Sequence, residues 1–420
     1  MDRSKGVVYT IDSKCVGCNK CMHKCPVEYA NVAVLDNGEN KISVDPLRCI
    51  NCGSCVEVCD HEARDYYDDT EVFFQALAKG ERVAVVAAPA VRFNFDPQKI
   101  CGFLKSRGAS VVYDVSWGAD ITTWAYLKAI REKGLKTVVA QPCPAIVSYA
   151  QRHCPGLLPW LAPVHSPMSC TAVYLRKYEK RTEKIAFLSP CIGKINEISD
   201  PSIRGLLDFN VTFRKLYDYI KANKIQLSSY ESADFDDMGC GLGLTFSRPG
   251  GLRENVEFHV PGAWVKQVEG VDHAYHYLKQ YSNRVKSGRQ VPLLVDILNC
   301  INGCNLGTAT GKNALVDDVD CETNRLKKQV VTEQVKKKRF RKETYALFDY
   351  FDKNLRLEDF MRTYMDQSAL LQDREPTMRE YEDTFALLHK TTEESRKVNC
   401  YACGLGSCKS FAKAVINCLR

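Results

Sequence analysis

From about residue 82, short apolar runs alternate with amphipathic segments. A continuous apolar run predicts a strand covered on both faces, because such a strand has no solvent-facing side. The runs that predict strands are 83–88, 111–114, 137–140, 185–188 and 293–298. A helix is predicted between the second and third of them, from about Asp120 to Gly134. This alternation predicts a parallel α/β sheet with helices on both faces.

Residues from about 325 to 395 follow a different pattern. The segment is highly charged, has almost no glycine and contains no strand-like apolar run. We therefore expect a helical connector there.

Composition narrows the class of protein. The chain has 420 residues, of which 45% are hydrophobic and 26% charged, as in soluble proteins of two to four domains. It has no apolar run long enough for a membrane span and no secretory signal at its start, so a cytoplasmic location without membrane contact is expected. Its 21 cysteines then indicate metal or cluster binding rather than disulfides. The formal charge of +7 counts cysteines as neutral, and each cluster site would add about −2, so we infer no nucleic-acid partner.

Two four-cysteine runs stand in the first seventy residues. They are Cys15, Cys18, Cys21 and Cys25, and Cys49, Cys52, Cys55 and Cys59. Both have the spacing of bacterial ferredoxins, in which the fourth cysteine of each run binds the other cluster. The spacing predicts one [4Fe–4S] cluster on Cys15, Cys18, Cys21 and Cys59, and a second on Cys49, Cys52, Cys55 and Cys25. Such a module transfers electrons and leaves substrate chemistry to another domain; zinc binding and chance are the alternatives.

Four more cysteines follow predicted strands. Cys143 comes after 137–140, Cys191 after 185–188, and Cys300 and Cys304 after 293–298. The carboxyl ends of strands are where open α/β sheets bind ligands. Four thiolates are what a further [4Fe–4S] cluster requires.

These segments resemble the three signature motifs of [FeFe]-hydrogenases. The matching positions are Cys143 in the first motif, Pro190, Cys191, Lys194 and Glu197 in the second, and Cys300, Gly303 and Cys304 in the third. The Ser166-Pro167 pair and the stretch that begins at Gly250-Gly251 also match. Together with the ferredoxin-like module, the resemblance covers roughly residues 1–315.

The resemblance implies an H-cluster. This cofactor is a [4Fe–4S] cube on Cys143, Cys191, Cys300 and Cys304, joined to a di-iron unit that carries CO, CN⁻ and a bridging dithiolate. Cys304 would bridge the two parts. Lys194 would donate a hydrogen bond to a cyanide ligand, in place of the ordinary role of an exposed surface lysine.

The chain departs from the family in the proton-transfer residues. Pro142 stands where fast members have a proton-passing cysteine, and residues 123–126 replace paired glutamates. Ser189 and Leu298 replace methionines near the second and third motifs. Proton delivery from a positioned acid contributes about 10²- to 10⁴-fold to a rate, so slow turnover is expected. These losses resemble those of the sensory members of the family.

Two residues could replace the missing proton donor. Cys170 lies four residues after Ser166, on the same face of a predicted helix, and could pass protons or be a plain buried cysteine. Glu254, after the glycine pair, is the second candidate relay.

A third cysteine motif lies near the end of the chain. Cys400, Cys403 and Cys408 resemble the ligands of a small [4Fe–4S] domain found in corrinoid proteins and in sensory hydrogenases. Cys418 or a cysteine after Arg420 would be the fourth ligand, and we expect a signalling domain downstream. Zinc binding is the alternative.

The sequence thus predicts an α+β ferredoxin-like 2[4Fe–4S] module at 1–70 and an α/β two-lobed [FeFe]-hydrogenase domain at 71–325. A helical connector at 326–395 and a truncated [4Fe–4S] motif at 396–420 complete the predicted domains. The predicted function is slow, reversible H2 oxidation with electron transfer through the clusters, serving H2 or redox sensing. The expected partners are H2, protons, a redox or signalling protein and the maturation machinery of the di-iron unit. A homodimer is a further possibility. The alternatives are a metabolic ferredoxin-linked hydrogenase and a non-enzymatic iron–sulfur protein of this fold without the di-iron unit.

Overall fold

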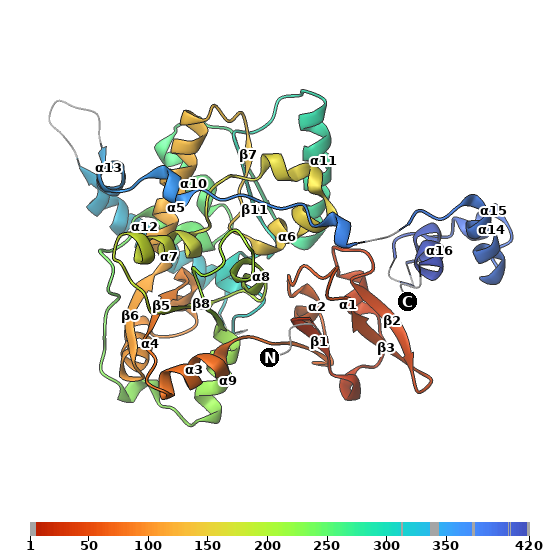
Figure 1. Cartoon of the computed structure of the whole chain (residues 1–420), viewed down its shortest axis with the longest axis horizontal. Helices are drawn as coiled ribbons and strands as arrows, with labels where there is room; N and C mark the ends of the chain where they lie inside the picture. The colour runs from red at the N-terminus through yellow and green to blue at the C-terminus, as the bar shows by residue number, and fades with distance from the viewer. Residues whose placement is uncertain are drawn as a thin grey trace. The chain divides into compact units, whose positions relative to one another are not determined.

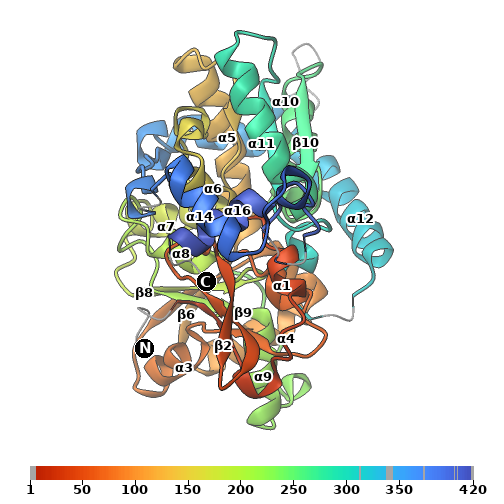
Figure 2. The ribbon, with the colours of Figure 1, turned by 90° about the vertical axis from the view of Figure 1, so that its right-hand side faces the viewer.

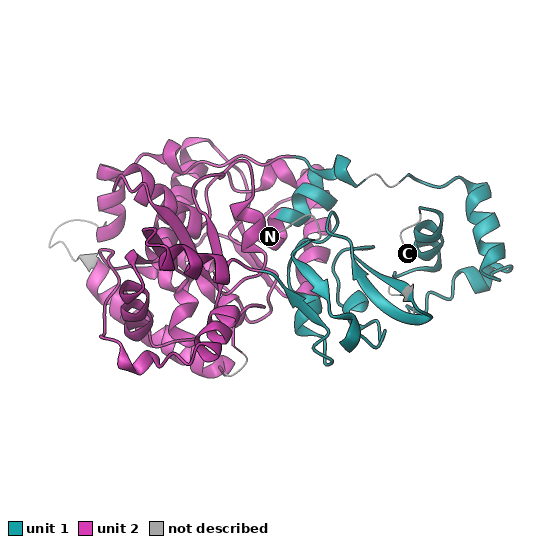
Figure 3. Ribbon diagram, turned by 60° about the horizontal axis from the view of Figure 1, so that its bottom comes forward, with its two compact units in different colours: residues 1–67, 148–155, 366–420 teal, residues 68–147, 156–365 magenta. Residues whose placement is uncertain are grey.

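The computed structural model describes residues 6–311, 314–336, 344–371, 374–401, 403 and 405–417. They divide into two compact units, which Figure 3 colours separately. The first unit comprises residues 1–67, 148–155 and 366–420, and the second comprises 68–147 and 156–365. Over the described residues, no helix combines the length and the apolar character needed to cross a membrane.

A four-stranded parallel sheet forms one part of the second unit (Figure 1). Its strands, in spatial order, are β6 (Ala109–Asp114), β5 (Val83–Ala87), β8 (Lys184–Ser189) and β9 (Phe209–Thr212). Every residue of β5 is buried, as its unbroken apolar run requires. The strands predicted at 83–88, 111–114 and 185–188 are confirmed, with small shifts of their ends.

A three-stranded parallel sheet forms another part of the same unit. Its order is β10 (Val265–Glu269), β11 (Leu294–Leu298) and β7 (Val138–Val139). Helix α11 (Val271–Lys286) packs beside β10 (Figure 2). The strands predicted at 137–140 and 293–298 correspond to β7 and β11. β10 has no continuous apolar run, and the prediction therefore missed it.

Helix α5 (Val115–Glu132) runs through the core of this unit and is buried over most of its length. It begins earlier than the predicted Asp120, because the Asp114 carboxylate accepts a hydrogen bond from the Ser116 amide at 2.8 Å and caps the helix. α5 packs closely on α7 (Pro167–Lys177). At Gly118 an added Cβ would lie 2.1 Å from the Thr171 hydroxyl, so only glycine fits this crossing.

The remaining helices of the second unit are α3 (Thr70–Ala78), α4 (Pro97–Ser106), α8 (Lys194–Ile198), α9 (Phe213–Ala222), α10 (Gly251–His259), α12 (Val316–Gln334) and α13 (Ala346–Asn354). Helix α6 (Pro144–His153) starts in the second unit and ends in the first. The segment expected as a connector differs from its prediction. Its part up to residue 365 belongs to the second unit, because Leu347, Phe351 and Phe360 are buried in the core. It also contains two short paired strands, β12 (Val335–Lys336) and β13 (Thr344–Tyr345).

The first unit contains a small α+β module at its N-terminal end. β1 (Val8–Thr10) pairs with β4 (Arg64–Tyr66), and β2 (Asn31–Asp36) forms a hairpin with β3 (Glu39–Val44). Two one-turn helices, α1 (Lys20–His23) and α2 (Ser54–Glu57), follow the second cysteine of each run. The C-terminal part adds α14 (Met378–Leu387), α15 (Glu393–Arg396) and α16 (Cys408–Ile416).

Candidate functional site

The N-terminal cysteines gather in two groups. The thiol of Cys55 interacts electrostatically with those of Cys49, Cys52 and Cys25. The thiol of Cys21 interacts in the same way with those of Cys15 and Cys59, and Lys20 lies near Cys18 and Cys59. In each group, therefore, the fourth cysteine of one run lies beside the other run. This is the crossed grouping that the ferredoxin spacing predicts, and all eight donors are thiols, which suits four-iron clusters.

Burial dominates the chemistry of these thiols. It raises the pKa of Cys25 to about 12 and that of Cys49 to about 11. A buried thiolate is therefore unfavourable unless a cation compensates it, which iron in a cluster would do.

A second group of cysteines lies at the edges of the two sheets in the second unit. Cys143 follows β7, Cys191 follows β8 and Cys304 comes after β11. The thiol of Cys304 interacts with those of Cys191 and Cys143, and burial raises the pKa of both Cys304 and Cys191, the latter to about 12. Three thiols from three distant strand ends therefore converge.

Cys300 lies in the same turn as Cys304. The Gly303 amide donates to the Cys300 carbonyl at 3.1 Å, and the side-chain amide of Asn299 lies 3.9 Å from the Cys300 sulfur. Gly303 has φ of +72°, and an added Cβ would lie 2.7 Å from the Ser247 carbonyl oxygen. The glycine of this motif therefore has a steric cause, because the turn passes too close to a neighbouring backbone for a side chain.

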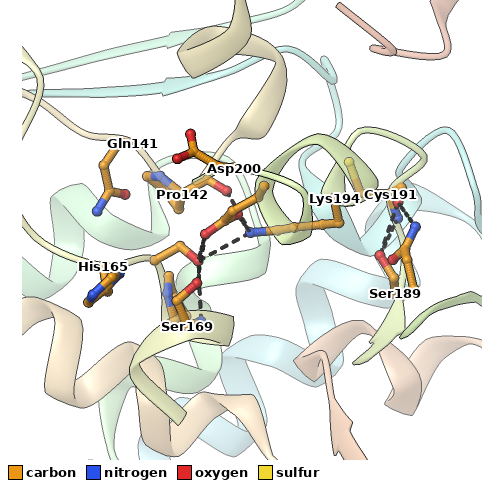
Figure 4. Close-up of polar contacts among 12 residues, drawn as sticks. Gln141, Pro142, His165, Ser169, Ser189, Cys191, Lys194 and Asp200 are labelled. Carbon is orange, nitrogen blue, oxygen red and sulfur yellow. Dashed lines mark hydrogen bonds and ion pairs between the residues drawn. The ribbon is translucent and has the colours of Figure 1, made fainter. Parts of the chain in front are cut away.

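Lys194 lies at the start of α8, beside the converging thiols. Its Nζ donates to the Glu197 carboxylate at 2.5 Å, to the Pro142 carbonyl oxygen at 3.1 Å and to the Ser166 hydroxyl at 3.3 Å (Figure 4). Its charge also acts on the thiols of Cys191 and Cys304. Lys194 is buried, so the surface-lysine alternative is wrong.

Glu197 is the centre of a buried network. Its carboxylate also accepts hydrogen bonds from the hydroxyls of Ser166 and Ser169, the latter at 2.9 Å. Arg362 lies 3.5 Å from it and pairs with Asp200 at 3.0 Å. Burial alone would raise the pKa of Glu197, but Lys194 and Arg362 reverse that shift and hold the pKa below its ordinary value. The carboxylate is therefore ionised and fixes the lysine.

Arg362 was missed from the sequence. It lies in the segment assigned to the connector, and no local motif marks it. The sequence feature that could have indicated its burial is the apolar Phe360 two residues earlier, which is fully buried.

The structure places the two candidate relays differently. Cys170 is fully buried on α7, and its thiol donates to the His165 carbonyl at 3.3 Å. Burial raises the pKa of Cys170 to about 12. Glu254, on α10, is partly exposed and pairs with Arg248 and, at 2.8 Å, with Lys327. It borders a cavity of about 330 Å³ that α12 also lines.

Two buried acids were also missed. Asp120, on α5, accepts hydrogen bonds from the amides of Gly241 and Gly243 at 2.6 and 2.9 Å, and burial raises its pKa to about 7. Asp296, on β11, accepts from the Arg253 amide at 3.0 Å, and burial raises its pKa to about 7 as well. Asp296 was visible as the one polar residue within the apolar run 293–298.

The C-terminal cysteines belong to the first unit. Cys408 is buried at the start of α16, Cys403 is half-buried and Cys400 is exposed. Cys418 lies outside the described residues. This part of the chain packs on the N-terminal module: Tyr29 clusters with Leu405 and Ala414, and its hydroxyl donates to the Ser410 carbonyl at 3.0 Å. A third cluster at this motif stays a prediction.

Among the described residues, no three His, Cys, Asp or Glu side chains converge closely enough to share a single metal ion. The thiolates of a four-iron cube bind four different irons, so they stand farther apart than the ligands of one ion.

Two family models match the chain. "Iron only hydrogenase large subunit, C-terminal domain" matches residues 81–277, and "4Fe-4S dicluster domain" matches residues 7–60. Residues 81–277 are therefore similar to the large-subunit domain of iron-only hydrogenases, and residues 7–60 are similar to a 4Fe–4S dicluster domain.

Curated relatives cover part of the chain. It is 27% identical over 295 residues to Iron hydrogenase 1 of Clostridium pasteurianum, which covers 60% of this chain and 51% of that protein. It is 25% identical over 202 residues to the Cytosolic Fe-S cluster assembly factor NAR1 of Vanderwaltozyma polyspora, covering 44% of this chain and 38% of that protein. The chain thus spans about half, or less, of the length of these relatives.

A solved structure shows the same fold. A variant of the [FeFe]-hydrogenase HydA1 from Chlamydomonas reinhardtii superposes with a TM-score of 0.50 at 16% identity, over 72% of this chain and 100% of that chain. The chain therefore has an [FeFe]-hydrogenase-like fold of mixed α/β and helical structure, with a ferredoxin-like N-terminal segment.

Proposed function

We propose that this chain is an [FeFe]-hydrogenase-like protein that binds H2 reversibly at an H-cluster and oxidises it slowly, as a sensor of H2 or redox state. One observation carries the proposal. Cys143, Cys191 and Cys304 converge beside Lys194, which donates to the carbonyl of Pro142, the residue that by resemblance stands in place of a proton-passing cysteine.

The residues of the site fit an H-cluster. Its cube would take the thiolates of Cys143, Cys191, Cys300 and Cys304. At Gly303 the third motif lies against residues 247–249 too closely for a side chain. When bound, the H-cluster supplies the irons at which H2 is split.

Lys194 is a buried cation placed to serve anionic ligands at this site. Glu197, Ser166 and the Pro142 carbonyl hold its ammonium group in one position. An ammonium group has three N–H donors, so these contacts compete with a ligand for them. We expect Lys194 to exchange one of these contacts for the cyanide when the cofactor is bound.

Proton transfer is the weak step of the proposed reaction. Pro142 offers the site a carbonyl oxygen and no proton. The Cys170 thiol is occupied by the His165 carbonyl and holds its proton tightly. Loss of a positioned acid costs a rate about 10²- to 10⁴-fold, which suits a protein that reports H2 rather than one that consumes it.

Electrons would pass between the H-cluster and the clusters of the ferredoxin-like module. The C-terminal cysteine motif packs on that module through Tyr29, which makes it a candidate exit toward a redox or signalling partner. We propose a cytoplasmic location and dependence on the maturation machinery of the di-iron unit.

A non-enzymatic iron–sulfur protein of this fold is the second candidate. The match to the cluster assembly factor NAR1 favours it. A metabolic ferredoxin-linked hydrogenase is the third, and high turnover after maturation would identify it.

Infrared spectroscopy of the matured full chain separates these candidates. We expect CO and CN⁻ bands that change between argon and H2, together with slow H2 oxidation by an artificial acceptor. Bands without any response to H2 would overturn the sensing proposal. Absence of bands, with intact [4Fe–4S] clusters, would establish the non-enzymatic candidate.

Substitution of Cys170 tests the proposed relay. We expect Cys170→Ala to lower the H2 oxidation rate at least about tenfold, because the variant lacks the thiol that would pass protons in the proposed relay. The infrared bands should persist in this variant. Cys101→Ala is the matched control, because Cys101 is equally buried on α4 and burial raises its pKa to about 12 as well. Equal H2 oxidation rates in the two variants would show that Cys170 only packs in the core and does not transfer protons.

A further inference from the structure

Arg64 places a positive charge inside the ferredoxin-like module. It is the first residue of β4, five positions after Cys59, and only 3% of its surface is exposed. A buried guanidinium requires acceptors or negative charges around it, because removing the charge from water is costly.

Protein oxygens accept hydrogen bonds from only some of the N–H groups of the Arg64 guanidinium. Nη1 donates to the Thr10 hydroxyl and, at 3.5 Å, to the Ile42 carbonyl, and Nη2 donates to the side-chain oxygen of Asn31. A guanidinium has five N–H donors. The buried Nε has no hydrogen-bond partner among the described residues. Donor capacity therefore remains for an acceptor that is not a protein oxygen.

Cysteines of both predicted clusters surround the same group. The guanidinium lies within hydrogen-bonding reach of the Cys21 thiol, which belongs to the first set. It also interacts electrostatically with Cys55 and Cys49 of the second set. Burial alone would lower the pKa of Arg64. The interactions with the sulfurs of Cys55 and Cys21 have the larger effect, and the pKa of Arg64 is raised above its ordinary value.

We infer that Arg64 is a cation shared by the two clusters of the ferredoxin-like module, and that it raises the reduction potential of both. Reduction adds one negative charge to a cluster. A fixed positive charge nearby, in a poorly screened interior, stabilises the reduced form more than the oxidised form. Hydrogen bonds to cluster sulfurs act in the same direction. The inference does not depend on whether the second unit binds H2.

Arg152 provides a matched comparison. It also belongs to the first unit, and its Nη1 donates to the Cys49 carbonyl at 2.8 Å and to the Leu47 carbonyl at 3.4 Å. Its charge acts on the thiol of Cys49, a member of the second set. We therefore expect Arg152 to influence one cluster, where Arg64 influences two.

The test is a redox titration of the full chain followed by electron paramagnetic resonance, with iron and sulfide content measured first. At the wild-type midpoint of each N-terminal cluster, Arg64→Gln should lower the ratio of reduced to oxidised form about tenfold, which equals about 59 mV for a one-electron couple. Arg152→Gln should lower this ratio for one cluster only. Arg64→Lys should retain most of the potential, because it retains the charge.

The inference fails if Arg64→Gln keeps both clusters at wild-type potentials. It also fails if only one potential shifts, since the charge would then not be shared. If Arg64→Gln loses iron, Thr10→Asp is the second variant, because a carboxylate there would neutralise the guanidinium without removing it. Both potentials should then fall, and unchanged potentials in a fully loaded Thr10→Asp protein would overturn the inference.

Discussion

The two cysteine-rich regions of this molecule collect their ligands in opposite ways. The ferredoxin-like module draws eight thiols from two short runs, residues 15–25 and 49–59. The second unit brings together Cys143, Cys191 and Cys304, which are separated by long stretches of chain and follow strands of two different parallel sheets. Local spacing is therefore sufficient for the first region, whereas the second depends on the whole α/β topology.

The two regions also differ in how charge is placed beside the thiols. In the module, Arg64 is a buried cation that interacts with the sulfurs of Cys55 and Cys21 and has no carboxylate partner among its main interactions. In the second unit, Lys194 and Arg362 are balanced by Glu197 and Asp200. The first arrangement favours an added electron, and the second fixes the direction of a hydrogen-bond donor without adding net charge.

The largest expected effect comes from removing a thiol at the sheet edges. Cys191→Ala should abolish the CO and CN⁻ infrared bands and the H2-dependent response, because the cube loses a ligand from β8. The two N-terminal clusters should remain, since their ligands lie in another unit. Iron content and electron paramagnetic resonance check this.

The reciprocal variant is Cys25→Ala. It should remove the cluster of Cys49, Cys52 and Cys55, whose group Cys25 joins in the structure. Loss of the other N-terminal cluster instead would contradict the crossed assignment.

A smaller effect is expected from the buried ion network. Arg362→Gln leaves two buried carboxylates with one cation, and breaking a buried pair in this way costs about 3–5 kcal/mol. Denaturant-induced unfolding of the full chain measures the loss. Lys177→Gln is the control, because its pair with Asp359 is partly exposed and is worth about 1 kcal/mol or less. Equal losses in the two variants would show that the network adds no stability.

The smallest effect concerns the buried acid of α5. Burial raises the pKa of Asp120 from an ordinary value of 3.8 to about 7, so the neutral form is favoured in the folded state. Its contribution to stability is present below about pH 3.8 and is lost as the pH rises through about 7. Between pH 5 and 8 this loss amounts to about 3 kcal/mol of the free energy of unfolding.

Asp120→Asn should remove this part of the pH dependence, as measured by unfolding at both pH values. The exposed Asp218→Asn should leave the dependence as in the wild type. A wild-type slope in the Asp120 variant would mean that the acid is ionised throughout this range.

Much of the architecture was predictable from local pattern. The apolar runs of β5, β8 and β11 identified buried strands, because a strand covered on both faces must be apolar throughout. The cysteines after β7, β8 and β11 then identified the ligand edge. β9 and β10 escaped prediction because their residues do not form such runs.

The charged partners of the site could not be predicted in this way. Cysteine spacing, the motif around Lys194 and the proline at 142 are local features, and the amino-acid sequence was enough to indicate cluster binding and a missing proton donor. Arg362 and Arg64 carry no such local signature. Each is defined by groups far away in the chain, and folding alone brings a buried charge to the partners that make its burial tolerable.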